Sequence, residues 1–170
     1  MLDSADPATG RSAVLADHTT LRLGGPATDF LVVPTEADLV EAVAAADAQG
    51  TPVLVLGGGS NLVVADAGFG GTVVRVATSG LAFDRVGDRV VVRIAAGEPW
   101  DAVVAACLAE GLAGIECLSG IPGLTGATPI QNVGAYGTEI SDVVVGVRVF
   151  DRAAGVQLRL VASRDRCRQS

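Results

Sequence analysis

The sequence contains no lysine and a single histidine, His18. Its 12 arginines are outnumbered by 19 acidic residues in a chain of 170, so the formal net charge is −7. Nucleic-acid backbones are held mainly by Lys and Arg, and apart from a short C-terminal run the sequence has no basic cluster. Nucleic acid is therefore not expected as a partner. A phosphate-bearing ligand would have to be held largely by backbone N–H groups and hydroxyls.

Histidine and cysteine are too scarce for several kinds of site. One histidine excludes a metal site built from several histidines and nearly excludes a histidine-based catalytic triad, so no metal ion is expected. The three cysteines, Cys107, Cys117 and Cys167, form no CxxC pair. An odd number without that spacing is typical of reduced thiols in a cytoplasmic protein, which is the expected location.

Long apolar runs are missing as well. No uninterrupted apolar segment approaches the roughly 18 residues that suggest a membrane span. Residues 1–11 are polar and lack the charged and apolar regions of a signal peptide. The expectation is a protein that has no membrane partner and is monomeric.

The sequence is rich in small apolar residues. Hydrophobic residues make up 49% of it and aromatic residues only 4%, a mixture that suits strands covered by alanine-rich helices. Strands are predicted at residues 30–33, 53–56, 62–64, 72–76, 90–94, 143–150 and 156–161. One helix is predicted between Thr35 and Gly50, and a second between Pro99 and Gly111. The apolar face of the second helix would carry Trp100, Val103, Val104, Cys107 and Leu108.

The order of these elements predicts an α+β fold in two lobes. Helices alternate with strands in the first half and hairpins follow, which does not fit a doubly wound parallel sheet. Residues 1–17 are expected to form a flexible tail. Lobe one is predicted at about residues 18–78 and lobe two at about residues 79–170.

A glycine-rich segment follows the predicted strand 53–56; it consists of Gly57, Gly58, Gly59, Ser60 and Asn61. Glycines permit positive φ and close approach of ligand oxygens, and successive N–H groups can line an anion site. A tight turn between two strands would explain the same glycines. A Walker loop is excluded because it needs lysine, and a Rossmann fingerprint is excluded because Leu62 stands where its third glycine would be.

A second segment, residues 121–137, mixes glycine and proline with polar and apolar residues. So long a loop inside a compact domain is usually functional. Heteroatoms of a planar ligand could bind its polar side chains, and Gly134 and Gly137 would let the ligand lie against the main chain. A surface loop rich in breakers is the alternative, although such a loop rarely carries so many apolar residues. The polar side chains in question are those of Thr125, Gln131, Asn132 and Tyr136.

Other conspicuous residues are interpreted as structural. Trp100 and Cys107 are expected in the core, His18 in solvent at the edge of the tail, and Glu116 in a partly exposed loop. The charged run formed by Arg164, Arg166 and Arg168 is expected to be solvated.

Taken together and in this order, the two segments resemble the UDP-N-acetylenolpyruvoylglucosamine reductase family. Residues 53–61 are similar to the pyrophosphate loop of the flavoproteins related to vanillyl-alcohol oxidase, whose FAD-binding domain is of the PCMH type. Residues 121–137 are similar to the signature of the reductases themselves. The resemblance runs from about His18 to Val161.

The resemblance implies an enzyme in which NADPH reduces a bound FAD and hydride then passes to an enolpyruvyl double bond. The product would be UDP-N-acetylmuramate, a peptidoglycan precursor, and the partners would be the UDP-sugar substrate and NADPH. FAD would lie between the two lobes, with its pyrophosphate on the first segment and its isoalloxazine bordered by the second. The cofactor-binding residues carried over are Gly57, Gly58, Gly59, Ser60, Asn61, Leu62, Ile121, Pro122, Gly123, Thr125, Gly126, Ile130, Gln131, Asn132, Val133, Gly134, Tyr136 and Gly137.

The sequence departs from the family near its C-terminus. Cys167 is followed by Arg168, Gln169 and Ser170, where the family has a Tyr-Arg pair. The family's proton-donating Ser and its second acid belong to a later domain. No catalytic residue is therefore assigned, and lobe two is expected to be incomplete and the chain inactive alone. Another FAD-linked oxidoreductase of the same superfamily and a non-catalytic flavin-binding remnant are the alternatives.

Overall fold

The computed structural model describes residues 13–161. The chain forms two compact units, which meet in the sequence between Ala77 and Thr78. Three predictions concern residues outside the described range: those for residues 1–12 of the tail, for the Cys167 thiol and for the arginine run after residue 161. No helix within the described range is both long and apolar enough to cross a bilayer.

Unit 1 is built on a parallel sheet of three strands in the order β1-β3-β2. The strands are β1 (Ala27–Val33), β2 (Val53–Leu56) and β3 (Phe69–Val76). Helix α1 (Glu36–Ala48) connects β1 to β2. It starts where the sequence predicts, because the Thr35 hydroxyl caps it by accepting a hydrogen bond from the Asp38 backbone N–H at 3.1 Å.

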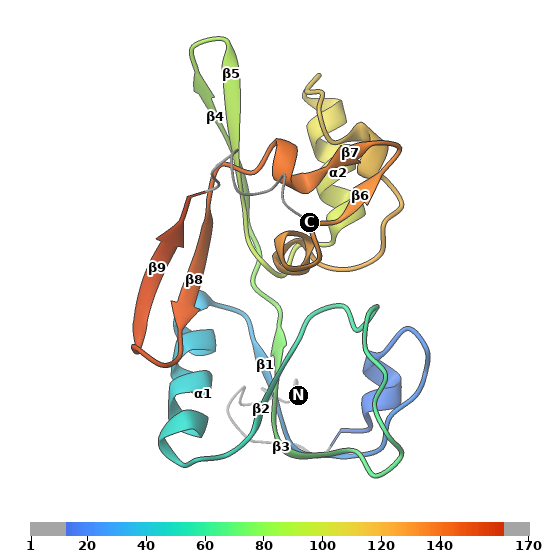
Figure 1. The fold of residues 1–170 in the computed structure, drawn as a ribbon, viewed down its shortest axis with the longest axis vertical. Coiled ribbons are helices and arrows are strands. Elements are labelled where there is room, and N and C mark those ends of the chain that lie inside the picture. Colours follow the sequence, from blue (N-terminus) through green and yellow to red (C-terminus); the bar gives the residue numbers. More distant parts are fainter. Residues whose placement is uncertain (1–12, 162–170) are drawn as a thin grey trace, which may run out of the picture. The chain divides into compact units, whose positions relative to one another are not determined.

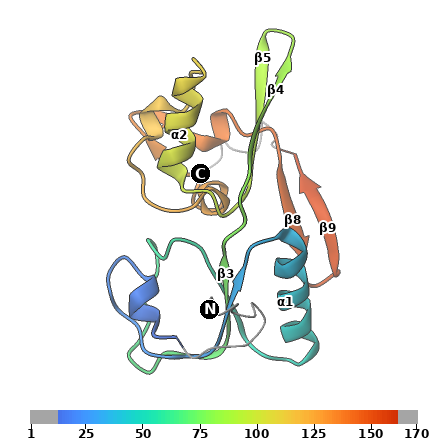
Figure 2. The ribbon, with the colours of Figure 1, turned by 180° about the vertical axis from the view of Figure 1, so that it is seen from behind.

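The two faces of this sheet are covered by different segments. Figures 1 and 2 show α1 on one side of the strands and the 3₁₀ helix η1 (Leu15–His18) on the other. On the η1 side lies a core cluster in which each residue is at most 8% exposed. Its members are Leu15, Ala27, Phe30, Leu56 and Val73.

Two expectations for unit 1 are wrong. Residues 13–17 are not a loose tail, because Leu15 is 1% exposed in the core and its N–H donates to the Gly25 carbonyl. Residues 62–64 form no strand. Leu62 and Val64 pack against the core while Val63 is exposed. Burial thus alternates along this segment as it would in a strand, although the segment pairs with no strand of the described range.

Unit 2 combines hairpins with one main helix. Strands β4 (Leu81–Val86) and β5 (Arg89–Ile94) pair antiparallel, as do β8 (Val147–Asp151) and β9 (Val156–Leu160). Helix α2 (Trp100–Ala109) buries Trp100, Val103, Val104 and Cys107 as predicted, together with Leu118 and Ile140. Burial raises the pKa of the Cys107 thiol, as expected for a structural cysteine.

Between these elements the chain forms short pieces. They are the 3₁₀ helices η2 (Glu116–Leu118), η3 (Thr125–Ala127) and η4 (Ile140–Asp142), helix α3 (Thr128–Gln131), and the paired strands β6 (Gly134–Ala135) and β7 (Thr138–Glu139).

Three details of unit 2 differ from prediction. Strand β4 has no counterpart among the predicted strands. The strand predicted at 143–150 begins only at Val147, because the valines before it follow η4 as an irregular segment. Leu108 is 48% exposed and so does not belong to the buried face of α2.

Candidate functional site

The glycine segment begins at the carboxyl end of β2, which lies beside the central strand β3 with Leu56 and Arg75 in register. Ligands of open α/β sheets commonly bind at the carboxyl ends of parallel strands. Gly59 has φ +66° and sits against the main chain of the 17–22 segment, where an added Cβ would come within 2.1 Å of the His18 carbonyl oxygen. The Thr20 N–H donates to the Gly59 carbonyl at 3.0 Å, so the two segments are bound to each other.

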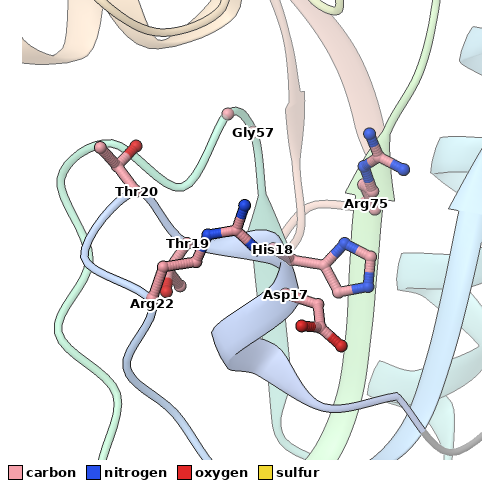
Figure 3. Close-up of a pocket in the computed structure, with 8 residues that line it drawn as sticks. Asp17, His18, Thr19, Thr20, Arg22, Gly57 and Arg75 are labelled. Carbon is pink, nitrogen blue, oxygen red and sulfur yellow. The ribbon is translucent and has the colours of Figure 1, made fainter.

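A pocket of about 410 Å³ opens beside this contact. Figure 3 shows its walls, which come from the 17–22 segment, the start of the glycine segment and β3. Its lining residues are Asp17, His18, Thr19, Thr20, Arg22, Gly57, Gly58 and Arg75.

Only Gly57 and Gly58 of the predicted set line this pocket. Gly59 is buried behind them, Ser60 is half-buried, and Asn61 is exposed. Leu62 packs against the core cluster and so has a structural position. The glycine segment therefore contributes main chain to the pocket.

The sequence does not predict most of the residues that line the pocket. Asp17, His18, Thr20 and Arg22 precede the first predicted strand, and Arg75 is the one charged residue within a buried strand pattern. His18 is not simply solvated, because its ring stacks on Phe30 with centroids 4.5 Å apart. A local feature that could have pointed to these residues is the glycine pair after Leu23, which is typical of a turn.

The second segment is held to unit 2 by its backbone. The Thr125 N–H donates to the Glu98 carbonyl at 2.9 Å and the Gly126 N–H to the Ala96 carbonyl at 2.8 Å. The Trp100 indole N–H donates to the Leu118 carbonyl at 2.9 Å just before the segment begins. This part of the segment is a fixed wall of the unit rather than a free loop.

The predicted polar residues of this segment divide into two groups. The Thr125 hydroxyl donates to the Glu98 carbonyl, and the Asn132 side chain donates to Glu139 Oε2 at 2.7 Å. The Asn132 side-chain oxygen also accepts from the Ser141 N–H at 3.3 Å. Gln131 and Tyr136 are exposed instead, Tyr136 to 93%. The second pair is thus available to a ligand, whereas the first pair holds the segment in shape.

The remaining predicted residues of the segment have mixed positions. Ile130 is 84% exposed, whereas Ile121 and Val133 pack against the core of unit 2. Gly123 accepts a hydrogen bond from the Trp100 N–H, and Gly126 lies so close to Ala96 that a side chain would clash. Pro122, Gly134 and Gly137 are exposed.

Strained backbone is concentrated in these two regions. Three non-glycine residues in the described range have positive φ: Arg22 at 55°, Asn132 at 45° and Tyr136 at 53°. Asn tolerates this conformation, but for long or bulky residues such as Arg and Tyr it is uncommon and costs energy. Such outliers cluster at functional sites. One lies in the pocket of unit 1 and two lie in the second segment.

Two carboxylates with shifted ionisation lie near the second segment. The Gly120 N–H and then the Ser119 hydroxyl hold the pKa of Asp101 below its ordinary value. Backbone N–H groups, those of Glu116 itself and Gly114, lower the pKa of Glu116 in the same way. Both carboxylates are exposed and organise turns. The described residues include no cluster of three or more groups able to hold a metal ion.

Residues 28–160 match the family described as FAD binding domain, and the chain belongs to that family. The fold class predicted from the order of the elements and the cofactor implied by the two segments are thereby confirmed: this is an FAD-binding domain of α+β type.

Comparison with individual relatives shows which FAD-binding proteins this chain is similar to. The chain is 60% identical over 164 residues to UDP-N-acetylenolpyruvoylglucosamine reductase of Saccharopolyspora erythraea, covering 96% of this chain and 44% of the relative. It is 59% identical over 145 residues to the reductase of Thermobifida fusca, covering 85% of this chain and 41% of the relative. The predicted resemblance to this reductase family is confirmed.

A solved structure gives the same result. The crystal structure of UDP-N-acetylenolpyruvylglucosamine reductase from Thermus caldophilus superposes with a TM-score of 0.72 at 30% identity, covering 91% of this chain and 53% of that chain. The chain spans less than half the length of the two curated relatives.

Proposed function

We propose that this chain supplies the FAD-binding part of an enzyme that reduces UDP-N-acetylenolpyruvoylglucosamine to UDP-N-acetylmuramate with NADPH. The observation that carries the proposal is that one chain contains both a pocket after β2 that includes glycine main chain and the second segment with its exposed polar side chains, and that this chain is 60% identical to a reductase of that name. The product would enter peptidoglycan synthesis, and hence cell-wall growth, cell shape and division.

The pocket of unit 1 has the chemistry to hold the pyrophosphate of FAD. Gly57 and Gly58 bring main chain to its surface, where no side chain keeps phosphate oxygens at a distance. Thr20 adds a hydroxyl, which can donate to phosphate. The donor set fits a diphosphate without any lysine.

The second segment has the chemistry to contact the isoalloxazine. Gln131 and Tyr136 offer exposed hydrogen-bonding groups, and Ile130 offers exposed apolar surface for a flat ring. Thr125 and Asn132 would act through the backbone that they hold in place. We infer that the other residues carried over from the family contribute main chain or packing.

When bound, FAD supplies the hydride, and the protein supplies orientation and electrostatics. Reduction of an enol ether beside a carboxylate also needs a cationic or hydrogen-bonding group for the carboxylate and a proton donor. The residues carried over from the family include none for those tasks, so we propose a flavin-binding role for this chain and assign it no catalytic step.

Several finer features belong to the same proposal. We propose NADPH as the reductant and a monomeric state from the family resemblance. We propose a cytoplasmic location from the cysteines, whose number and spacing suggest reduced thiols. No nucleic acid or membrane partner is proposed, in keeping with the net charge of −7.

The test is an absorption spectrum of the purified chain with added FAD, followed by titration of flavin fluorescence. We expect bound flavin and a large loss of affinity in Gly58→Val, where a side chain would stand between the main chain and the phosphates. The matched control is Gly70→Val, because a Cβ at Gly70 meets nothing within 4 Å. A chain that stays colourless after refolding with FAD contradicts the proposal.

The same experiment separates the alternatives. A flavin that survives acid precipitation would be covalently attached and would indicate an oxidase of the superfamily instead. Flavin binding without turnover, even after the C-terminal part of a relative is supplied in trans, would indicate a non-catalytic remnant.

A further inference from the structure

The loop that carries Arg22 is built around the buried hydroxyl of Thr19. That hydroxyl donates to the Leu23 carbonyl at 2.9 Å and accepts from the Leu23 N–H at 3.2 Å. The Arg22 N–H donates to the Thr19 carbonyl at 3.2 Å and completes a tight turn. Thr19 is 5% exposed, so the turn is fixed from inside the unit. Arg22 is thereby held at φ 55°, a conformation that arginine seldom adopts.

Arg75 reaches the same pocket from another element. It is next to the last residue of β3, in register with Leu56 on β2 and Val32 on β1. Partners in register point to the same face of a sheet. Leu56 is part of the core on the η1 face, so Arg75 lies on that face at the carboxyl end of the central strand. Figure 3 shows Arg22 on the 17–22 segment and Arg75 on β3, two walls of the pocket that Gly57 also lines.

Neither guanidinium group forms an ion pair with an acidic residue of the described range, whereas Arg85 and Arg93 of unit 2 do pair with acidic residues. Asp17 also lines the pocket but forms no ion pair with either arginine there. In a chain of net charge −7, two arginines against the single carboxylate of Asp17 give the lining of this pocket a local excess of positive charge. Guanidinium groups favour phosphate because they bind its oxygens in a planar, two-pronged arrangement.

We propose that Arg22 and Arg75 clamp the diphosphate of the dinucleotide from opposite walls of this pocket. The clamp rests on the proposed function and adds to it the residues that select a diphosphate. The glycine main chain provides uncharged donors, and the two arginines provide the balancing charge. The pocket therefore prefers a dinucleotide diphosphate to a flavin that lacks phosphate, and the strained turn around Thr19 is retained because it aims Arg22.

The test compares three variants of the 170-residue chain. Arg22→Asn removes the charge and keeps a residue that tolerates positive φ. Arg75→Gln removes the charge and keeps a long polar side chain. Arg89→Gln is the matched control, because Arg89 is exposed on β5 in unit 2 and does not line this pocket. Dissociation constants are measured for FAD, ADP and riboflavin at low and at moderate salt.

We expect each pocket variant to weaken FAD and ADP by about tenfold or more, the size of one charge-assisted hydrogen bond. Riboflavin, which has no phosphate, should bind the variants and the wild type alike. Salt should weaken FAD binding to the wild type more steeply than to the variants. Arg89→Gln should behave as wild type.

The outcomes separate the clamp from the proposal beneath it. If the wild type binds FAD but Arg22→Asn and Arg75→Gln bind it as well as Arg89→Gln does, the clamp is wrong and the flavin-binding function stands. Equal losses for riboflavin also overturn the clamp. If the wild type binds neither FAD nor ADP, both are overturned.

Discussion

The two candidate segments differ in what they offer to a ligand: the first offers backbone and the second offers side chains. Residues 57–61 bring main chain to a pocket, and Gly59 lies so close to the His18 carbonyl oxygen that a side chain there would clash. Residues 121–137 are held by backbone hydrogen bonds and also by side chains such as Asn132, and they leave the side chains of Gln131 and Tyr136 in solvent. The first segment tolerates no side chain where it packs, whereas the second uses side chains both for shape and for contact.

The difference shows why one kind of substitution cannot test both segments. In the glycine segment, adding atoms should be damaging and there are few atoms to remove. In the second segment, removing atoms should separate the residues that shape it from those that face a ligand. The predictions below follow from this contrast.

The largest effect is expected for Gly59→Ala. A methyl group there would approach the His18 carbonyl oxygen to 2.1 Å, and the residue has φ +66°. We expect a loss of about 3 kcal/mol or more in the free energy of unfolding, because backbone must move. The measurement is urea unfolding followed by circular dichroism.

Gly50→Ala is the matched control for that loss. Gly50 has a similar φ of +65°, but a Cβ there meets nothing within 4 Å. Only the conformational penalty of roughly 1–2 kcal/mol should remain. Equal losses in the two variants would mean that the contact with the 17–22 segment is not what requires Gly59.

In the second segment, Asn132→Ala should be the more damaging of two neighbouring substitutions. It removes the bonds to Glu139 and Ser141 and puts alanine at positive φ. We expect a loss of about 1–2 kcal/mol. Gln131→Ala, at an exposed position, should change stability by less than about 0.5 kcal/mol and still weaken flavin binding. The reverse order in thermal unfolding would show that the two residues have been assigned the wrong roles.

Tyr136→Asn should affect stability and binding in opposite directions. Tyr136 is almost fully exposed at φ 53°, a conformation that asparagine accepts more readily. We expect a gain of about 0.5–1 kcal/mol in stability and weaker binding of FAD. Tyr136→Phe keeps the ring and the backbone, so its stability should equal that of the wild type. A loss of stability in Tyr136→Asn would show that the tyrosine is held there by packing rather than for contact.

The smallest effect concerns pH and the turn before the second segment. The pKa of Asp101 is lowered in the folded chain by the Gly120 N–H and the Ser119 hydroxyl. Its stabilising contribution is therefore complete above the ordinary aspartate pKa and is lost as pH falls through the lower, folded pKa. Asp101→Asn should be slightly less stable than wild type at neutral pH, with the difference shrinking in acid. A difference that is constant from neutral to acid pH would contradict this.

The sequence predicts the elements that are specified by local chemistry. Thr35 before an alanine-rich stretch marks the start of α1, and Pro52 followed by four apolar residues marks β2. The buried face of α2 follows from the spacing of Trp100, Val103 and Cys107. The sequence does not predict β4, because Asp84 and Arg85 interrupt its apolar pattern. The strand forms by antiparallel pairing with β5.

The pocket is harder to predict because it is assembled from distant parts of the chain. Arg22 and Arg75 belong to no shared motif, and their proximity depends on the strand order β1-β3-β2. No sequence pattern assigns strain to Arg22 or Tyr136. The glycine segment was conspicuous only because its composition is extreme. The role of the cofactor-binding residues in both segments stays a prediction.

The hydrogen bond from Thr20 to the Gly59 carbonyl closes a long stretch of chain that contains β1, α1 and β2. A ligand that contacts both the 17–22 segment and the glycine segment can bind only when unit 1 is folded. By mass action, each tenfold rise in free dinucleotide above its dissociation constant would add about 1.4 kcal/mol to the stability of the unit. The supply of cofactor in the cell would then govern how long the unit survives proteolysis.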